Sequence, residues 1–94
     1  MHIGVCRVKL YLPESRSLKD KRRVIKSIIT RLRNKFNIAI AEIEAQDMHQ
    51  SAILAAVSVA NEQKFVSQII AKSVRFIEDN TSVVLLDYET EFFF

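Results

Sequence analysis

The sequence has little cysteine, proline or glycine: one residue of each among 94, and no tryptophan. A single cysteine, Cys6, excludes an intrachain disulfide and favours a reducing compartment, so we expect a cytoplasmic protein. One glycine and one proline argue against a glycine-rich phosphate loop, a collagen-like segment and a flexible linker. Uncharged stretches such as residues 51–61 are too short to cross a bilayer, and the N-terminus lacks the pattern of a signal peptide. We therefore expect no membrane association.

The charge is distributed unevenly along the chain. The formal net charge is only +3, but residues 14–35 hold nine of the 14 basic residues and only two of the 11 acidic ones. The remainder holds five basic and nine acidic residues. Such asymmetry predicts a positive face that binds a polyanion. The length, with no internal repeat, predicts one domain spanning residues 1–94.

Hydrophobic periodicity predicts strand, helix and strand in the first half. Residues 3–12 alternate between apolar and polar side chains, which is typical of a half-buried strand, and Pro13 begins a loop. From Leu18 the apolar residues recur at helical spacing, and Ser17 with Asp20 resembles a capping box at the start of that helix. Residues 36–45 alternate again and predict a second strand.

The second half repeats the sequence of strand, helix and strand. Residues 51–60 are small or apolar on both faces, as in a central strand, although their alanines leave a helix as an alternative. Asn61 is the expected N-cap of a second amphipathic helix whose apolar stripe runs to Ile77. Residues 81–93 alternate and predict the last strand.

The order βαββαβ predicts an α+β, ferredoxin-like sandwich: a four-stranded antiparallel sheet with two helices on one face. The first and third strands should be central. The residues expected beneath the helices are Cys6, Val8, Leu10, Val84 and Leu86. The charged residues expected on the uncovered face are Arg7, Lys9, Asp87 and Glu89, as opposite charges on neighbouring strands.

Several stretches of the chain resemble the YlxP-like family of small bacterial domains. The most specific is Ser17-Leu-Lys-Asp-Lys-Arg-Arg-Val24, flanked by Leu12-Pro13 and by Arg31-Leu-Arg-Asn-Lys-Phe-Asn37. The similarity continues through Ala41-Glu42, Asp47 and Gln50 and so covers nearly the whole chain.

The resemblance implies a ferredoxin-like domain of unknown function, with no activity or cofactor attached. The family's genes often lie near those for translation initiation and ribosome maturation factors, which implies a connection to RNA or the ribosome. His49 stands where members commonly carry a tryptophan. A contact made by that aromatic would therefore be altered in this chain.

The basic face of the first helix is the leading candidate for a binding site. Lysine and arginine side chains that neutralise phosphates release counterions, which favours binding of nucleic acid. Like charges at Lys19, Arg23 and Lys26 repel one another without acidic partners, which suggests a use for them. The alternative is a solvated face whose long side chains, such as Lys21 and Arg22, cover the edge of the core. The candidate nucleic-acid-binding residues are Arg16, Lys19, Arg22, Arg23, Lys26 and Arg33.

The uncovered sheet face supports a rival function as a homodimeric protein-interaction or structural domain. Apolar side chains such as Ile3 and Val5 would otherwise lie in water, so we expect a homodimer through this face. The small residues expected to allow close approach of another sheet are Ala52, Ala55, Ala56 and Ser58. Tyr11 could stack on a base there, but the third strand offers no aromatic partner. Phe92, Phe93 and Phe94 are expected to pack on the core or on another subunit.

No residue pattern indicates catalysis. His2, Cys6, Asp47 and His49 lack the spacing of metal ligands. Glu42 and Glu44 should share one strand face as solvated carboxylates without a nucleophile. We expect a non-enzymatic protein with no catalytic residues, no metal, no cofactor and no small-molecule substrate. An enzyme that acts on an anionic substrate is the weakest rival.

Overall fold

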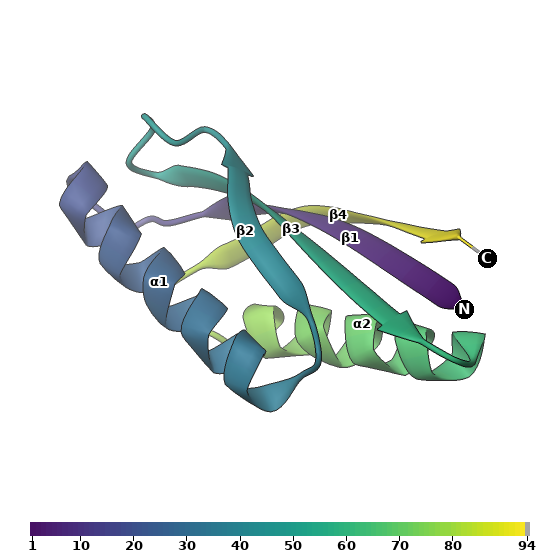
Figure 1. Cartoon of the computed structure of the whole chain (residues 1–94). Helices are drawn as coiled ribbons and strands as arrows, with labels where there is room; N and C mark the ends of the chain where they lie inside the picture. The colour runs from purple at the N-terminus through teal and green to yellow at the C-terminus, as the bar shows by residue number, and fades with distance from the viewer. Residues whose placement is uncertain (94) are drawn as a thin grey trace.

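The computed structural model describes residues 1–93 and contains six elements in the predicted order. These elements are β1 (His2–Tyr11), α1 (Leu18–Lys35), β2 (Ala39–Glu44), β3 (Ser51–Ala60), α2 (Gln63–Glu78) and β4 (Val84–Phe93). The strand order is β2-β3-β1-β4, with every neighbouring pair antiparallel. Both helices lie on the same side of the sheet (Figure 1). The ferredoxin-like prediction, with β1 and β3 in the centre, is confirmed.

One hydrophobic core lies between the sheet and the helices. Alternate residues of β1 and β3 point into it, which is why Cys6, Val8 and Leu10 are buried as predicted. Their partners from α1 include Ile28 and Leu32, both fully buried. The apolar stripe of each helix therefore meets the apolar face of the sheet.

The prediction for β4 is wrong at Val84 and Leu86, because the strand contains a bulge. The register against β1 shifts between Lys9 and Leu10, so that Leu10 lies opposite Leu85. Leu85 packs against the core, whereas Val84 and Leu86 are 44% and 54% exposed. One extra residue in a strand reverses the faces of the residues beyond it.

A second register shift separates the two glutamates of β2. It falls between Glu42, which lies opposite Leu54, and Glu44, which lies opposite Ile53. Leu54 is buried beneath the helices, and Ile53 belongs to the uncovered face. The expectation that the two carboxylates share one face is therefore wrong.

The third predicted strand is confirmed as β3, but most of its small residues face inward. Ala52, Ala56 and Ser58 are buried under the helices, and only Ala55 of the predicted set alternates onto the open face. The three buried small residues allow the helices, rather than another sheet, to approach β3 closely.

The start of α1 matches its sequence signal, whereas the start of α2 does not. Ser17 is the N-cap of α1: its Oγ accepts a hydrogen bond from the Asp20 amide, and the Asp20 carboxylate accepts one from the Arg16 amide. The N-cap of α2 is Glu62, without a side-chain capping bond, so the prediction of Asn61 is wrong by one residue.

Candidate nucleic-acid interface

The outer face of α1, defined as Lys19, Arg22, Arg23, Lys26 and Arg33, is a cluster of exposed cations. At 100° per residue these five positions fall within an arc of about 100°, on the side of the helix turned from the sheet. They extend over about 21 Å of the helix axis at 1.5 Å per residue. Arg16, the sixth candidate, is exposed just before the helix. The sequence therefore predicted a set of side chains that the fold places together.

Within the described part of the chain, no carboxylate forms an ion pair with the side chains of this face. Within residues 1–93, the ion pairs are Arg7 with Glu44 and Lys21 with Glu42, and neither involves the outer face. One member has a backbone partner: Arg33 Nη2 donates to the carbonyl of Ile40, 2.9 Å away. Arg33 is thus fixed towards the β2 edge, while Lys19, Arg23 and Lys26 reach into solvent.

Lys21 lies in the same basic run but has the opposite environment, since it is fully buried. Its Nζ donates to Glu42 Oε2 at 2.8 Å and to the backbone carbonyls of Ala45 at 2.7 Å and Ser51 at 3.1 Å. A buried ammonium is tolerated only when its charge and its donors have such partners. Lys21 therefore connects α1 to the turn between β2 and β3.

The helical positions around Lys21 carry a signal for this burial. Ile25, Ile28 and Leu32 follow Lys21 at i+4, i+7 and i+11, so all four share the buried stripe of α1. Periodicity alone predicted Lys21 only at the border of that stripe. Its acceptors could not be predicted, because they come from residues 42–51 and depend on the β2 bulge.

Two comparisons with known proteins bear on this arrangement. The family profile described as "Protein of unknown function (DUF503)" matches residues 3–90 of the chain. The chain belongs to the DUF503 family. It is similar to the uncharacterized protein YlxP of Bacillus subtilis (strain 168), with 31% identity over 91 residues, covering 97% of this chain and 99% of that protein. The expected YlxP-like membership is thereby confirmed.

Among solved structures, the de novo designed protein Foldit4 has a similar fold. The TM-score is 0.56 with 10% sequence identity, over all of this chain and 98% of the designed one. At that identity the likeness concerns the fold alone.

Several of the residues that carry the resemblance to the YlxP-like family have structural roles in this chain. Ser17 caps α1, Lys21 is its buried ammonium, and Glu42 is the partner of Lys21. Gln50 joins the loop before α1 to β3, since its Nε2 donates to the carbonyl of Ser15 at 3.2 Å. His49, beside it, is exposed. These contacts attach the start of α1 to the rest of the domain, and the outward cations lie between the residues that make them.

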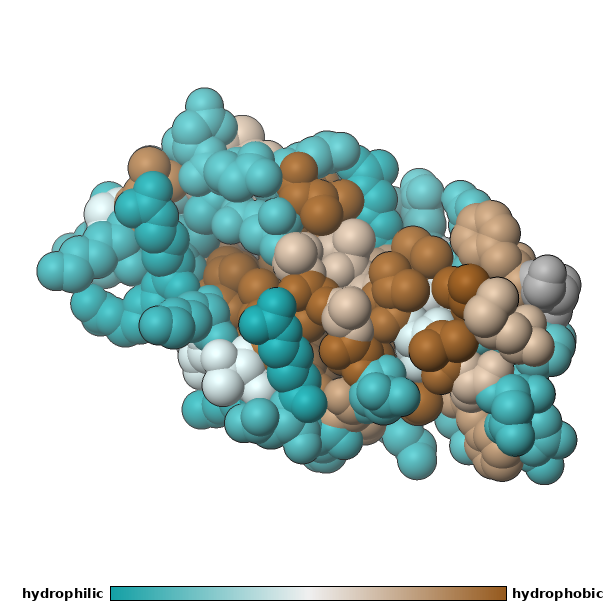
Figure 2. Space-filling model, viewed as in Figure 1, coloured by the Kyte–Doolittle hydropathy of each residue, from teal (hydrophilic) through white to brown (hydrophobic). Residues whose placement is uncertain are grey.

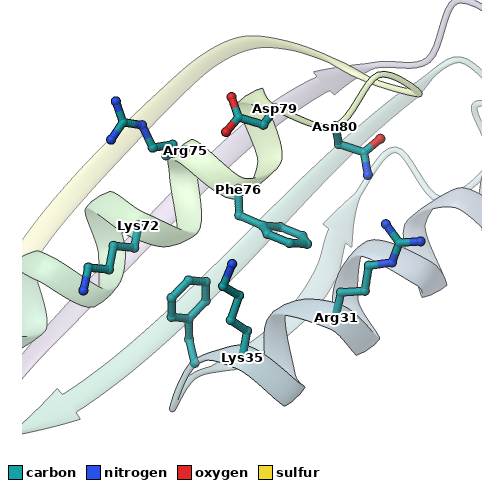
Figure 3. A pocket seen from close by; sticks show the side chains of 8 residues that line it. Arg31, Lys35, Lys72, Arg75, Phe76, Asp79 and Asn80 are labelled. Carbon is teal, nitrogen blue, oxygen red and sulfur yellow. The ribbon is translucent and has the colours of Figure 1, made fainter.

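A second group of cations, absent from the residues predicted to bind nucleic acid, lines a groove between α1 and α2. Its basic residues are Arg31 and Lys35 from α1 with Lys72 and Arg75 from α2. Figure 3 shows the side chains of Lys35 and Phe76 pointing toward one another across this groove. A signal existed in the sequence, because all four are outward positions in the C-terminal halves of the two helices. Only the packing of the helices made one site of them.

The remaining candidate residues do not come together. Cys6 is buried on β1, where burial raises the pKa of its thiol more than the hydrogen bond from Thr90 lowers it. Within residues 1–93, no three His, Cys, Asp or Glu side chains are grouped as metal ligands. Phe92 packs on the core and Phe93 is exposed, while Phe94 lies outside the described residues. Neither α1 nor α2 has the length and apolarity needed to span a membrane.

Proposed function

We propose that this domain is a non-catalytic, RNA- or ribosome-associated protein that contacts RNA phosphates through the outer face of α1. One observation carries the proposal: five exposed cations share one helix face, and no carboxylate of the described chain pairs with them. Fixing several like charges on a rigid helix is unfavourable in the free protein and favourable on a polyanion, where each contact releases counterions.

Contacts of this kind favour RNA over small anionic ligands. The outer face is convex and about 21 Å long, so it can reach several phosphates at once but encloses none of them. Phosphate contacts do not read the sequence of the RNA. We therefore expect weak sequence preference and a steep dependence of the affinity on salt.

The test is a titration of labelled structured RNA at several salt concentrations, with the dissociation constant read by fluorescence anisotropy. The test variant combines Arg23→Glu with Lys26→Glu. Loss of two phosphate contacts should reduce the slope of log K against log salt by about 1.4 to 1.8. The matched control combines Lys9→Glu with Lys64→Glu, which changes the net charge equally at exposed positions outside α1. The control should keep most of the wild-type slope. Absence of binding at low salt, or equal losses in both variants, would contradict the proposal.

The open face of the sheet favours a second function, homodimerisation. Ile3 lies between Val59 of β3 and Phe93 of β4, and Val5 lies opposite Val57. Val57, Val59 and Phe93 are 40%, 49% and 49% exposed. Figure 2 shows hydrophobic residues gathered toward the end of the molecule where the N-terminus lies, and hydrophilic ones toward the opposite end. A second copy that covers this patch would remove it from water.

Sedimentation velocity tests this second function directly. We expect a dimer for the wild-type chain and a monomer for Val59→Asp, because a carboxylate on the patch would be buried without a partner. Glu62→Ala, an exposed change outside the sheet, is the control and should leave the dimer intact. A wild-type monomer at every concentration would exclude the homodimer.

A further inference from the structure

The groove between the two helices combines positive charge with aromatic rings. It has a volume of about 550 Å³ and is lined by Arg31, Lys35, Lys72 and Arg75 together with Phe36, Phe76, Asn80 and a single carboxylate, Asp79. That volume lies within the range of natural ligand sites, about 300 to 1,000 Å³. The groove is therefore large enough for one nucleotide unit.

The charge of the groove is not compensated within the described chain. Four cations and one carboxylate leave a formal charge of +3 (4 − 1) in the lining. Neither ion pair of residues 1–93 involves these side chains. The C-termini of α1 and α2 each supply about half a negative charge, which is too little to neutralise the remainder. An anionic ligand would complete the site.

The aromatic rings lie next to the cation that would hold the anion. Lys35 Nζ is 5.4 Å from the centre of the Phe76 ring and 5.8 Å from that of Phe36. Figure 3 shows Lys35 extending from α1 toward Phe76 of α2, with Arg31 nearer the N-terminus of α1. An anion bound at Lys35 would bring an attached planar group against these rings. A nucleotide has both the anion and the planar group, because its sugar joins a phosphate to a base.

We propose, on the basis of the RNA binding proposed above, that this groove receives an unpaired nucleotide of the bound RNA. The phosphate contacts Lys35 and Lys72, and the base packs against Phe76. A base in a duplex is stacked and paired, so only a single-stranded segment can supply it. α1 contributes residues to both the outer face and the groove. A duplex on the outer face can therefore continue as a single strand into the groove.

The test compares two labelled RNAs, a duplex and the same duplex with a single-stranded 3′ extension. We expect the wild-type protein to bind the extended RNA about fivefold or more tightly, as stacking of one base provides. Lys72→Glu should abolish this preference, whereas Lys64→Glu, the same change on the first turn of α2, should preserve it. Phe76→Leu, which changes no charge, should also abolish the preference and leave duplex binding unchanged. Circular dichroism verifies that each variant is folded.

Amide chemical shifts locate the extension on the protein. The extended RNA should shift the amides of Arg31, Lys35 and Lys72 beyond the shifts that the duplex causes. Equal affinity for both RNAs, with losses only in the outer-face variant, would overturn the groove proposal and leave the proposed function intact. Failure of both RNAs to bind would overturn both. Free adenosine monophosphate that shifts the groove amides, where the extension does not, would overturn the RNA source and assign the groove to free nucleotides.

Discussion

The two helices are fixed to the same face of the sheet by different means. α1 carries a fully buried ammonium, Lys21, bound to a carboxylate and to backbone carbonyls of the β2–β3 turn. α2 makes a close apolar contact: Val66 and Ile70 lie so near Gly4 of β1 that a Cβ atom at this position would clash with both. Both helices bury an apolar stripe, but α1 adds a contact that depends on direction and charge, and α2 adds one that depends on close approach.

This difference explains how a strongly basic helix can be held in one orientation. The apolar stripe of α1 turns one side of the helix toward the sheet, although apolar side chains can be repacked with little loss of stability. A buried ammonium with several fixed acceptors permits one arrangement. We infer that Lys21 directs the outer face of α1 to solvent, so a structural cation sets the position of the exposed ones.

The largest expected effect is loss of the Lys21 attachment. Lys21→Met should lower the free energy of unfolding by about 3 to 5 kcal/mol, because it leaves Glu42 and several carbonyls without their partner. Urea unfolding monitored by circular dichroism measures the change. Lys19→Met, an exposed change two residues earlier, is the matched control and should stay within about 0.5 kcal/mol of wild type. Equal stability of the two variants would contradict the difference between the inner and outer cations.

The next effect concerns the close approach of α2. Gly4→Ala places a methyl group against Val66 and Ile70, so we expect a loss of about 1 to 3 kcal/mol in the free energy of unfolding. The double variant Gly4→Ala with Ile70→Val, which shortens the side chain in contact, should recover part of the loss. Losses that simply add, with no recovery in the double variant, would show that the contact does not limit the packing of α2.

A smaller effect is expected at the start of α1. Ser17→Ala removes the cap that accepts from the Asp20 amide, and should cost about 1 kcal/mol. Thr30→Ala, at an exposed position within α1, is the control, and should be neutral or slightly stabilising because alanine favours helices. A cost for Thr30→Ala as large as that for Ser17→Ala would indicate that capping contributes nothing specific.

The smallest expected effect is a pH-dependent contribution of the buried Cys6 thiol to the free energy of unfolding. Burial raises the pKa of the Cys6 thiol, so the unfolded chain loses its thiol proton first as the pH rises. The free energy of unfolding should therefore fall above pH 9.0, where the thiol of the unfolded chain ionises. Cys6→Ala should lack this component. Urea unfolding of both proteins across the alkaline range measures it, and parallel pH profiles would contradict it.

The sequence predicted the larger features of the fold because they depend on local periodicity. Alternation and helical spacing were sufficient for five of the six elements, and Ser17 with Asp20 predicted the start of α1. For residues 51–60 a helix had remained as the alternative, and the structure has a strand there. The errors arose where register decides. The faces predicted for Val84 and Leu86 were wrong because of a bulge in the pairing of β4 with β1. A second bulge, in the pairing of β2 with β3, separates Glu42 from Glu44, which were expected on one face. Asn61 was wrong because the capping residue proved to be its neighbour, Glu62.

The functional residues, like the fold, could be predicted only where local spacing brings them together. The outer face of α1 could be predicted because its residues lie within one helix and their spacing alone places them together. The groove could not, since its residues lie about 40 positions apart on two helices. Lys21 was assigned to the border of the apolar stripe, because nothing within α1 identifies the acceptors that bury it.

The sequence by itself determined the order of the elements, the family and the accumulation of positive charge on one helix. All three follow from residue types and short-range spacing. Only the tertiary structure decided which cation is buried, which glutamate pairs with it and which cations of the two helices share a groove. These outcomes require segments distant in the chain to meet, and the strand register that brings them together depends on the packing of the whole sheet.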